Sequence, residues 1–338
     1  MDWRAQDFRA RNLAKKVLDV FGSDPNVTIT ENLDVSLEKL HVFSEFSKLR
    51  TVYVRLPHNL DWSEPINLQE QEMQNNRPNR LIATLQHANF IDMILASGAK
   101  VIIGFCDKDM QTDHDSQGRE IKRPIMPEEV YTRDPLQVVG GTALRGKMKT
   151  DVRAPETMAV NGGVLDVPGG CIEFGDFFVV RKGQVLVTSG RRTDEPAIAG
   201  AINVINASDG TAWTAHILPK EDSILHGDCV TGAIPTNDGN SFEGAYVYPN
   251  AYLNPTHAIE VLKNIYGRVI GILSDSTRKV LGANLLWLDP TIALVNSAAE
   301  KMALLLETYG KEVLRPNLGE IGKGDGSGRC SSAPLYRD

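Results

Sequence analysis

The stretch ALVNSAAEKMALLLETYGKEVL, residues 293–314, decides the predicted fold. Apolar residues run together over 293–296, recur at helical spacing over 302–306 and return at 313–314. This pattern predicts a strand, a helix that ends at Gly310, and a second strand. A strand, a helix and another strand in this order are typical of an α/β fold.

The same pattern recurs elsewhere in the chain. A second copy consists of a strand at 81–85, a helix at 90–95 and a strand at 101–103. Two weaker copies lie at 197–218 and 257–273. These copies predict an internally repeated α/β fold, and their irregular spacing argues against a solenoid.

The beginning of the chain differs in character from the rest. Residues 1–45 are predicted to form a polar, partly helical lead-in, which is compatible with a lid, an oligomer contact or a flexible arm. Its helix is indicated by apolar residues at roughly helical spacing, namely Phe8, Leu13, Val17, Leu18 and Phe21. In residues 46–338 short apolar runs alternate with Gly and Pro without a long linker, which predicts a single α/β domain.

The composition is that of an ordinary globular chain, with 42% hydrophobic and 23% charged residues among 338. The net charge of −7 argues against a nucleic-acid surface. No apolar run approaches the ~18 residues of a membrane span, and the first ten residues lack the features of a secretory signal. We therefore predict a cytoplasmic protein that binds neither nucleic acid nor membrane. The sequence leaves homo-oligomerisation open.

The four cysteines, Cys106, Cys171, Cys229 and Cys330, lack the CxxC spacing of a zinc site and do not suggest a disulfide scaffold. Cys106 and Cys171 are expected to be small buried residues. Cys330 follows a glycine-rich run and the cation Arg329, and both features help to present a reactive thiolate. The sequence therefore makes Cys330 the candidate nucleophile.

Asp134 stands in an Arg-Asp-Pro sequence that precedes an apolar strand at 136–140. Asp134-Pro135 is a typical start of a turn, and Arg133 alone would usually be a surface charge. An aspartate at the mouth of a strand can also accept two hydrogen bonds from a guanidinium group. The motif by itself leaves both interpretations open.

The residues Glu173-Phe174-Gly175-Asp176 predict a sharp turn, and a strand is expected at 185–187. An aspartate in such a turn usually binds backbone N–H groups. Glu173 has apolar neighbours, so a raised pKa and a role in proton transfer are the functional alternative.

His226 and Asp228 are predicted to lie on one strand and to face the same side, with Cys229 pointing away. An imidazole and a carboxylate presented together suit acid–base chemistry. A structural hydrogen bond between them in the core is the alternative. No third ligand lies at a suitable spacing, so a metal site is not expected.

In this order, the motifs at 133–135, 173–176, 226–228 and 329–330 resemble the guanidino-group-modifying superfamily. The resemblance covers about residues 48 to 338. The superfamily contains arginine deiminases, dimethylarginine hydrolases and amidinotransferases. The resemblance implies an α/β fold, the pentein α/β-propeller, in which five ββαβ-type repeats surround a pseudo-fivefold axis with the site at the centre.

The resemblance also implies a role for each matching residue. Cys330 matches the nucleophile, His226 the general acid/base, and Glu173 the acidic residue that works with the histidine. Asp134 and Asp228 match the carboxylates that hold the guanidinium group. The resemblance implies that the partner is a small guanidino substrate. It implies no cofactor, neither a metal nor an organic group.

The motifs distinguish the branches of the superfamily from one another less clearly than they indicate the superfamily itself. Arg329-Cys330 and the ending at 334–338 are most similar to arginine deiminases, whereas residues 133–140 are also similar to amidinotransferases. Arg133, Arg329 and Glu129 are further candidates for substrate binding.

Two residues depart from the arginine deiminase pattern. Phe174 replaces a glycine of the Glu-Gly-Gly-Asp motif and is expected to add bulk beside the site. Glu129 is assigned to the position of an asparagine that helps to hold the α-carboxylate of the substrate, and a carboxylate there would repel that group. The substrate would then lack a free α-carboxylate. If Glu129 instead points to solvent on a turn, it has no bearing on the substrate.

The implied reaction is hydrolysis at the guanidinium carbon through a covalent thiouronium intermediate on the cysteine, with release of ammonia or an amine. An amidinotransferase would form the same intermediate and pass it to an amine. A pentein that only binds a partner would not need Cys, His and three acids in this order. An unrelated Cys–His hydrolase would not need the two aspartates.

Overall fold

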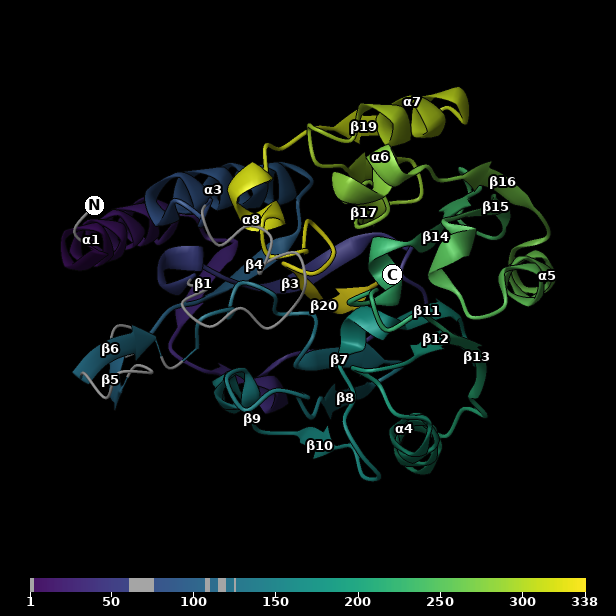
Figure 1. The fold of residues 1–338 in the computed structure, drawn as a ribbon, viewed down its shortest axis with the longest axis horizontal. Helices are drawn as coiled ribbons and strands as arrows, with labels where there is room; N and C mark the ends of the chain where they lie inside the picture. Colours follow the sequence, from purple (N-terminus) through teal and green to yellow (C-terminus); the bar gives the residue numbers. More distant parts are fainter. Residues whose placement is uncertain (1–2, 61–75, 107–109, 115–119, 125) are drawn as a thin grey trace.

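Most strands belong to five separate sheets, which follow one another around the middle of the molecule (Figure 1). The computed structural model describes residues 3–60, 76–106, 110–114, 120–124 and 126–338. In the order of the sheets, the strands are β1 (Val27–Thr30), β3 (Leu49–Arg55), β4 (Lys100–Gly104) and β20 (Ala333–Arg337); β7 (Leu136–Val139), β8 (Thr142–Arg145) and β10 (Val164–Asp166); β11 (Phe177–Arg181), β12 (Gln184–Ser189) and β13 (Thr214–Pro219); β14 (Thr231–Pro235), β15 (Phe242–Val247) and β16 (Val269–Ile272); and β17 (Leu286–Asp289), β18 (Ile292–Leu294) and β19 (Glu312–Leu314).

Each sheet contains the same unit, in which two antiparallel strands are followed by a third strand parallel to the second. β11 pairs antiparallel with β12, and β12 pairs parallel with β13. The strands β7, β8 and β10, β14 to β16, and β17 to β19 repeat this arrangement. In the first sheet β20 is antiparallel to β3, and β3 is parallel to β4, so a strand from late in the chain completes a unit that begins early.

A helical segment connects the second strand of each unit to the third, because a parallel strand cannot be reached through a tight turn. These segments are α3 (Arg80–Ala96), the 3-10 helix η3 (Ala154–Ala159), α4 (Glu195–Asp209), α5 (Pro255–Tyr266) and α7 (Glu300–Thr308). The other described elements are α1 (Trp3–Phe21), α6 (Asp275–Lys279), α8 (Gly319–Gly322), β2 (Leu33–Asp34), β5 (Met110–His114), β6 (Glu120–Pro124), β9 (Val160–Asn161), and the 3-10 helices η1 (Val35–Leu37), η2 (Pro57–Asn59), η4 (Phe174–Asp176), η5 (Gly227–Cys229) and η6 (Pro249–Ala251).

The strand, helix and strand expected at 293–314 are confirmed as β18, α7 and β19, and Gly310 has a positive φ of 70°. The weaker copies are confirmed as well, since 197–218 contains most of α4 and β13, and 257–273 contains most of α5 and β16. The Gly310 backbone lies in the left-handed region, which a residue without Cβ adopts at little cost.

The strand expected at 81–85 is wrong, because these residues form the first turns of α3. Asn79 caps this helix by accepting hydrogen bonds from the N–H groups of Leu81 and Ile82 at 3.1 and 3.3 Å. The helix expected at 90–95 and the strand at 101–103 are confirmed as parts of α3 and β4.

The first 45 residues contribute a helix and strands to this arrangement. α1 packs against α3, and its residues Ala14, Leu18 and Phe21 are buried in the same apolar cluster as side chains of α3. β1 pairs in parallel with β4, so part of the expected lead-in is an edge strand of the first sheet. The division of the chain at residue 45 stays a prediction.

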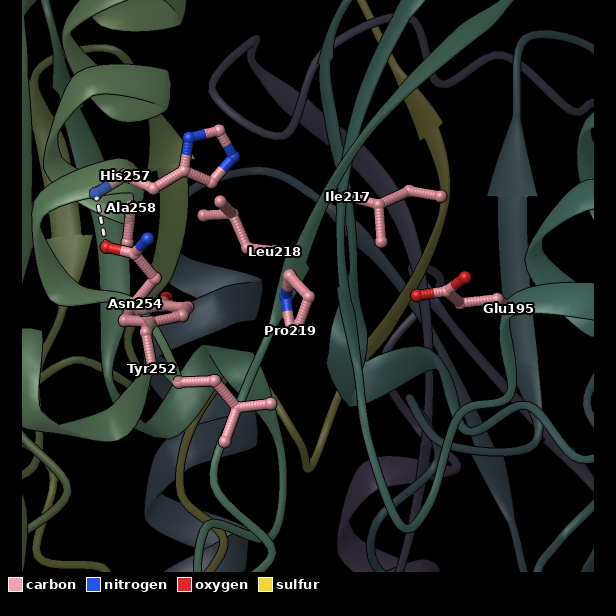
Figure 2. Close-up of a pocket in the computed structure, with 9 residues that line it drawn as sticks. Glu195, Ile217, Leu218, Pro219, Tyr252, Asn254, His257 and Ala258 are labelled. Carbon is pink, nitrogen blue, oxygen red and sulfur yellow. Dashed lines mark hydrogen bonds between the residues drawn. The ribbon is translucent and has the colours of Figure 1, made fainter.

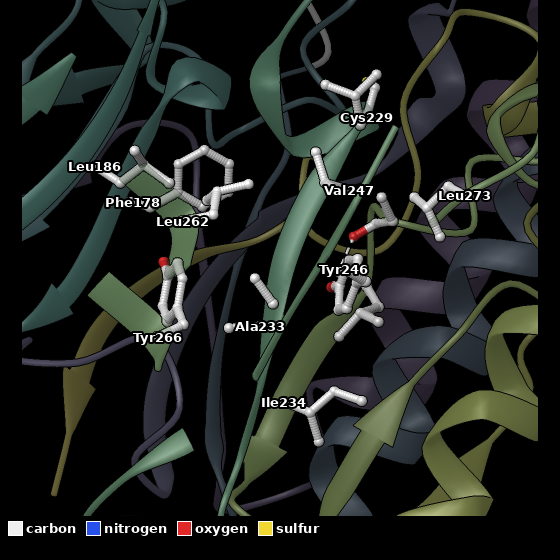
Figure 3. Close-up of a cluster of buried hydrophobic side chains, with 14 of the residues drawn as sticks. Phe178, Leu186, Cys229, Ala233, Ile234, Tyr246, Val247, Leu262, Tyr266 and Leu273 are labelled. Carbon is white, nitrogen blue, oxygen red and sulfur yellow. Dashed lines mark hydrogen bonds between the residues drawn. The ribbon is translucent and has the colours of Figure 1, made fainter. Parts of the chain in front are cut away.

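Three clusters of buried apolar side chains fill the space around the sheets. Figure 3 shows one of them, where Leu186 of β12, Tyr246 of β15 and Leu262 of α5 are buried together. This packing fixes the positions of the strands. The candidate site residues lie near the beginnings of these strands. Each helix in the described part of the chain is too short or too polar to cross a bilayer.

Candidate active site

Five residues that the sequence singles out meet in one buried cluster. Cys330, His226, Asp134, Asp228 and Glu173 are each at most 2% exposed. Each lies shortly before the first strand of a unit, which is β7 for Asp134, β11 for Glu173, β14 for His226 and Asp228, and β20 for Cys330. These strands begin near the middle of the molecule (Figure 1), so residues far apart in the sequence meet there.

Two side chains hold the Cys330 thiol. Its Sγ lies 3.3 Å from Asp228 Oδ2 and accepts a hydrogen bond from Asn284 Nδ2 at 2.9 Å. Asn284 Oδ1 accepts in turn from the backbone N–H of Cys330 at 3.1 Å and of Ser327 at 3.2 Å. The amide of Asn284 therefore fixes both the backbone and the sulfur of the candidate nucleophile.

Sequence reasoning missed Asn284. It lies just before β17, the first strand of the fifth unit. The repeat itself carries a signal for it, because each of the other four units places a candidate site residue just before its first strand.

Carboxylates face both ring nitrogens of His226. Nε2 lies 2.9 Å from Glu173 Oε2, and Nδ1 lies 3.5 Å from Asp134 Oδ1. Burial lowers the pKa of His226, but the charge of Asp134 and hydrogen bonds with Cys330 and Glu173 outweigh burial and raise it well above its ordinary value. The imidazole is therefore positively charged at neutral pH and can donate a proton.

Glu173 is surrounded by groups that favour its anion. Oε1 accepts hydrogen bonds from the backbone N–H of Lys149 at 2.9 Å and from Arg192 Nη1 at 3.2 Å. Burial raises the pKa of Glu173, but the hydrogen bond with His226 and the charge of Arg192 lower it by more, so the net shift is downward. The expected raised pKa is wrong, because these polar neighbours outweigh the apolar ones.

The two carboxylate oxygens of Asp134 have different surroundings. Oδ2 accepts a hydrogen bond from Arg153 Nη1 at 2.8 Å. Oδ1 has no hydrogen-bond partner among the described residues and lies beside His226 Nδ1. Asp134 therefore presents one buried acceptor oxygen at the site.

Arg153, which sequence reasoning missed, lies among four carboxylates. Besides Asp134, its guanidinium lies 2.8 Å from Glu156 Oε2, 3.1 Å from Glu128 Oε2 and 3.7 Å from Glu173 Oε2. Burial, together with the charge of Glu128, raises the pKa of Glu156 to about 8 although Arg153 lowers it. Arg153 precedes η3 in a loop between β8 and β9, where the local sequence contains no pattern that would single it out.

Asp228 binds Arg329 and Cys330 through the same oxygen. Oδ2 accepts from Arg329 Nη1 at 2.9 Å. The Arg329 guanidinium also donates to the two Glu45 oxygens at 2.8 and 2.6 Å and to the Phe177 carbonyl at 2.6 Å. Arg329, a candidate for substrate binding, is thus engaged by protein groups and positions Asp228.

Arg133, the second candidate arginine, is engaged in a similar way. Its Nη1 donates to Gln137 Oε1 at 3.2 Å and lies 3.8 Å from Glu45 Oε1. Burial, and next the charge of Arg329, lower the pKa of Arg133 to about 10. Its backbone N–H donates to the Cys330 carbonyl at 3.0 Å, so its contact with the nucleophile is through the main chain.

Of the two middle residues of this motif, Gly175 and not Phe174 faces the His226 ring. A Cβ at Gly175 would lie 2.6 Å from His226 Cγ and 2.9 Å from Asp134 Oδ1. The ring of Phe174 packs edge-on against Phe177, with the ring centres 5.9 Å apart, in a buried apolar cluster. The expectation that Phe174 adds bulk beside the site is therefore wrong, because its side chain lies in the core.

Glu129 is 3% exposed, so the alternative in which it points to solvent is wrong. Its Oε2 accepts from Arg55 Nε at 2.7 Å, and its Oε1 accepts from Asn59 Nδ2 at 3.2 Å. Because Arg55 compensates its charge, the argument that Glu129 repels an α-carboxylate does not follow from this geometry. Its neighbour Glu128 contacts Arg153, which in turn binds Asp134.

Residues 227–229 form the 3-10 helix η5, so the strand expected for His226 to Cys229 is wrong; β14 begins only at Thr231. The backbone N–H of Gly227 donates to Asp176 Oδ1 at 2.8 Å and holds this turn. Side chains in such a turn do not alternate between two faces as they do on a strand. Cys229 Sγ therefore lies 3.6 Å from Asp228 Oδ1 instead of pointing away.

The two cysteines expected to be structural differ from each other. Cys171 is buried as expected, with its Sγ 3.1 Å from Asp194 Oδ2. Burial, followed by the hydrogen bond with Asp194, raises the pKa of the Cys171 thiol to about 11. Cys106 is only half-buried.

Asp134, Glu173 and His226 offer oxygen and nitrogen atoms that all lie within 4.8 Å of one another, a spacing that also suits a metal ion. The guanidinium of Arg153 already contacts both carboxylates, and the imidazole carries a positive charge. These cations compensate the two acids, so we assign no metal to the cluster.

A separate surface hollow of about 400 Å³ lies between β13 and the start of α5 (Figure 2). Glu195, His257 and Tyr252 contribute to its lining. None of the five clustered residues lines it, so it is not part of the candidate active site.

Comparison with solved structures identifies the fold. The amidinotransferase SxtG from Microseira wollei superposes with a TM-score of 0.65 at 16% identity, covering 88% of this chain and 97% of SxtG. A dimethylarginine dimethylaminohydrolase from Pseudomonas aeruginosa, solved with citrulline, superposes with a TM-score of 0.63 at 15% identity, covering 85% of this chain and 99% of that enzyme. The chain therefore has the α/β fold of the pentein proteins.

Comparison of sequences agrees with the structural comparison. The arginine deiminase of Borreliella afzelii is 27% identical over 252 residues, which are 63% of this chain and 62% of that enzyme. The match thus spans less than two thirds of the length of the curated relative. No family model matches the chain. By sequence and fold together, the chain is similar to proteins of the guanidino-group-modifying superfamily.

Proposed function

We propose that the protein is a cysteine-dependent enzyme that acts on the guanidinium carbon of arginine or an arginine-like compound. The observation that carries this proposal is that the buried Cys330 thiol contacts one buried aspartate and shares its cluster with a second. Asp228 Oδ2 lies 3.3 Å from Cys330 Sγ, and Asp134 Oδ1 lies beside the His226 imidazole. A guanidinium carbon is a poor electrophile, so such a site has to orient the group and pair its charge.

The two aspartates would hold the guanidinium group of the substrate. Asp134 Oδ1, which is buried and lacks a hydrogen-bond partner in the described part of the chain, would accept one N–H group. Asp228 would accept a second N–H group in place of its contact with the Cys330 thiol. This binding would place the central carbon of the guanidinium against Cys330 Sγ.

In the first half of the reaction, Cys330 sulfur forms a bond to the guanidinium carbon. The positive charge of the bound guanidinium would favour the Cys330 thiolate, and the thiol proton would leave to solvent as Asp228 exchanges its thiol contact for the substrate. The positively charged His226 would protonate the leaving nitrogen, and the C–N bond would break. Ammonia or an amine departs, and a thiouronium group remains on Cys330.

In the second half, His226 is neutral and would take a proton from a water molecule as it attacks the same carbon. Glu173, 2.9 Å from Nε2, would stabilise the imidazolium that forms again. The C–S bond then breaks, the Cys330 thiol is restored, and a ureido product leaves.

Transfer of the amidino group to an amine is the second candidate, since it uses the same intermediate. One observation favours it, which is that Cys330 and the other four residues of the cluster are at most 2% exposed. A transferase has to exclude water until its amine acceptor arrives. Hydrolysis and transfer differ in the acceptor and not in the residues proposed above.

Two finer proposals concern the scaffold. We propose that the five sheets are the blades of a pentein α/β-propeller with a pseudo-fivefold arrangement, and that residues 46–338 form its single catalytic domain. The shared strand pairing of the five units supports the first proposal. The partner of this domain would be a small guanidino compound.

The test is mass spectrometry of products from arginine, agmatine, N-substituted arginines and guanidino acids, each with and without an added amine. Hydrolysis predicts a ureido product in both conditions, and transfer predicts a new guanidine only with the amine. The Cys330→Ser variant is the matched control. Absence of any product, together with absence of an adduct on Cys330, would contradict the proposal.

A further inference from the structure

A second thiol lies beside the candidate nucleophile. Cys229 ends the 3-10 helix η5, and Cys330 lies shortly before β20, so they come from turns far apart in the sequence. The Asp228 carboxylate contacts both thiols, with Oδ2 at 3.3 Å from Cys330 Sγ and Oδ1 at 3.6 Å from Cys229 Sγ. One carboxylate therefore holds both sulfur atoms, one at each of its oxygens.

Core packing alone does not account for Cys229. Its side chain is 3% exposed and belongs to the apolar cluster of Figure 3, where Val247 is also buried. The sulfur nevertheless contacts polar groups, since it lies 3.4 Å from the Asp325 carbonyl in addition to its contact with Asp228. The proposed reaction gives Cys229 no task, so its position against Cys330 calls for another explanation.

The surroundings of the two thiols suit different tasks in oxidation. The hydrogen bond with Cys330, then burial and the charge of Asp228, raise the pKa of the Cys229 thiol well above its ordinary value. Cys229 therefore stays a thiol in the reduced protein and does not compete with Cys330 for an electrophile. It can still attack a neighbouring sulfur once that sulfur has become electrophilic.

We propose that Cys229 is a resolving cysteine, which closes a disulfide with Cys330 after a peroxide has oxidised Cys330, and so switches the site off reversibly. The loss of activity rests on the proposed function, in which Cys330 is the nucleophile. The formation of the disulfide requires only the two thiols and a peroxide.

The chemistry balances in two steps. In the first, Cys330 sulfur attacks one peroxide oxygen and the O–O bond breaks; the sulfur is oxidised to a sulfenic acid, and hydrogen peroxide is reduced to water. In the second, Cys229 sulfur attacks Cys330 sulfur, the S–S bond forms and the S–O bond breaks. Asp228 Oδ1, 3.6 Å away, takes the Cys229 proton and passes it to the departing hydroxide, which leaves as water.

Disulfide formation would also remove Cys330 from its catalytic contacts. An S–S bond of ~2.05 Å is shorter than any non-bonded contact between two sulfur atoms, so the two side chains would have to move toward each other. Cys330 Sγ would then leave the Asn284 amide, with which it now makes a hydrogen bond of 2.9 Å. A dithiol reductant would restore both thiols and the geometry described above.

The test treats the reduced full-length protein with an equimolar amount of hydrogen peroxide, blocks free thiols by alkylation and maps peptides without reduction. We expect a peptide that joins Cys229 to Cys330 and, before alkylation, an intact mass lower by about 2 Da. Guanidino turnover should be lost in proportion to this peptide and return with dithiothreitol.

The Cys229→Ser variant is the matched comparison, with Cys171→Ser as a control that should behave like the parent. In Cys229→Ser, Cys330 should advance to sulfinic acid, and the loss should no longer be reversed by dithiothreitol. Sulfinic acid at Cys330 to the same extent in the parent and in Cys229→Ser, without a joined peptide, would overturn the proposal. A joined peptide in a protein that turns over no guanidine would instead overturn the proposed function and leave the disulfide intact.

Discussion

His226 Nε2 lies 2.9 Å from Glu173 Oε2, and both side chains are fully buried. This contact orients the imidazole so that Nδ1 faces Asp134. Nδ1 is therefore the ring nitrogen that would exchange a proton with a ligand bound at Cys330.

Replacement of Glu173 by glutamine should move the alkaline limb of the pH–rate profile to lower pH. The raised pKa of His226 keeps its acid form present as the pH rises, and Glu173 contributes to that shift. Without the carboxylate the pKa should fall, so activity that needs the imidazolium should be lost about 1 pH unit or more earlier. The check is kcat against pH, with Asp166→Asn at the surface as the control; an unchanged limb would contradict the role of Glu173.

Replacement of Cys330 by alanine should abolish turnover, with a loss of about 10³-fold or more in kcat, because the covalent intermediate cannot form. Cys171→Ala should keep most of the activity, since the Cys171 thiol is hydrogen-bonded to Asp194, which lies outside the cluster. Initial rates with the best guanidino substrate measure both. Substantial activity in Cys330→Ala would exclude the covalent mechanism.

Replacement of Asp134 or Asp228 by asparagine should lower kcat/KM by roughly 10- to 150-fold, the cost of one charged hydrogen bond. Both variants should stay folded, because Arg153 keeps Glu156 and Arg329 keeps Glu45 as partners. Steady-state kinetics with thermal unfolding as the folding control separates the two effects. A variant that processed guanidines as well as the parent would show that its aspartate does not hold the substrate.

Replacement of Gly175 by alanine should impair catalysis, because the new Cβ would lie 2.6 Å from His226 Cγ and displace the ring. We expect a loss of about 10²-fold in kcat, typical of a ring misplaced by about 1 Å. Gly141→Ala is the control, since its Cβ would have an ordinary contact at 3.7 Å with Asp209. Equal rates in the two variants would contradict this account.

Replacement of Glu156 by glutamine should flatten the dependence of stability on pH. The pKa of Glu156 is raised to about 8 in the folded protein, chiefly by burial. Because this pKa is raised, the contribution of Glu156 to the stability of the folded protein is fully present below the unfolded pKa of ~4.3 and is lost as the pH rises through about 8. Thermal unfolding at intervals from pH 5 to pH 9 should show a smaller decrease in stability with rising pH for Glu156→Gln than for the parent. Equal decreases would mean that another group is responsible for the pH dependence.

The sequence predicts the strand and helix units and the main site residues because both depend on local patterns. Apolar spacing predicts β18, α7 and β19, and short motifs mark Asp134, Glu173, His226, Asp228 and Cys330. The helix over 81–85 could not be told from a strand, since a short apolar run suits either, and the cap at Asn79 decides.

The remaining site residues depend on contacts between distant parts of the chain. Arg153, Asn284 and Glu45 reach the cluster only through tertiary packing, and their neighbours in the sequence form no motif. The lowered pKa of Glu173 has the same origin, since the His226 and Arg192 side chains that cause it come from other turns. Local hydrophobicity therefore predicts the burial of Glu173 but not the direction in which its pKa shifts.

The pairing of β20 with β3, in which Ala333 lies opposite Tyr53, also determines when the site is completed during folding. Bringing together strands so far apart closes a very long loop, and such contacts form slowly. A nascent chain that has emerged as far as β19 already contains every strand of four of the five sheets, but β3 still lacks its antiparallel neighbour and Cys330 has not been fixed by Asn284. Cys330, the proposed nucleophile, would therefore be the last of the five clustered residues to reach its position.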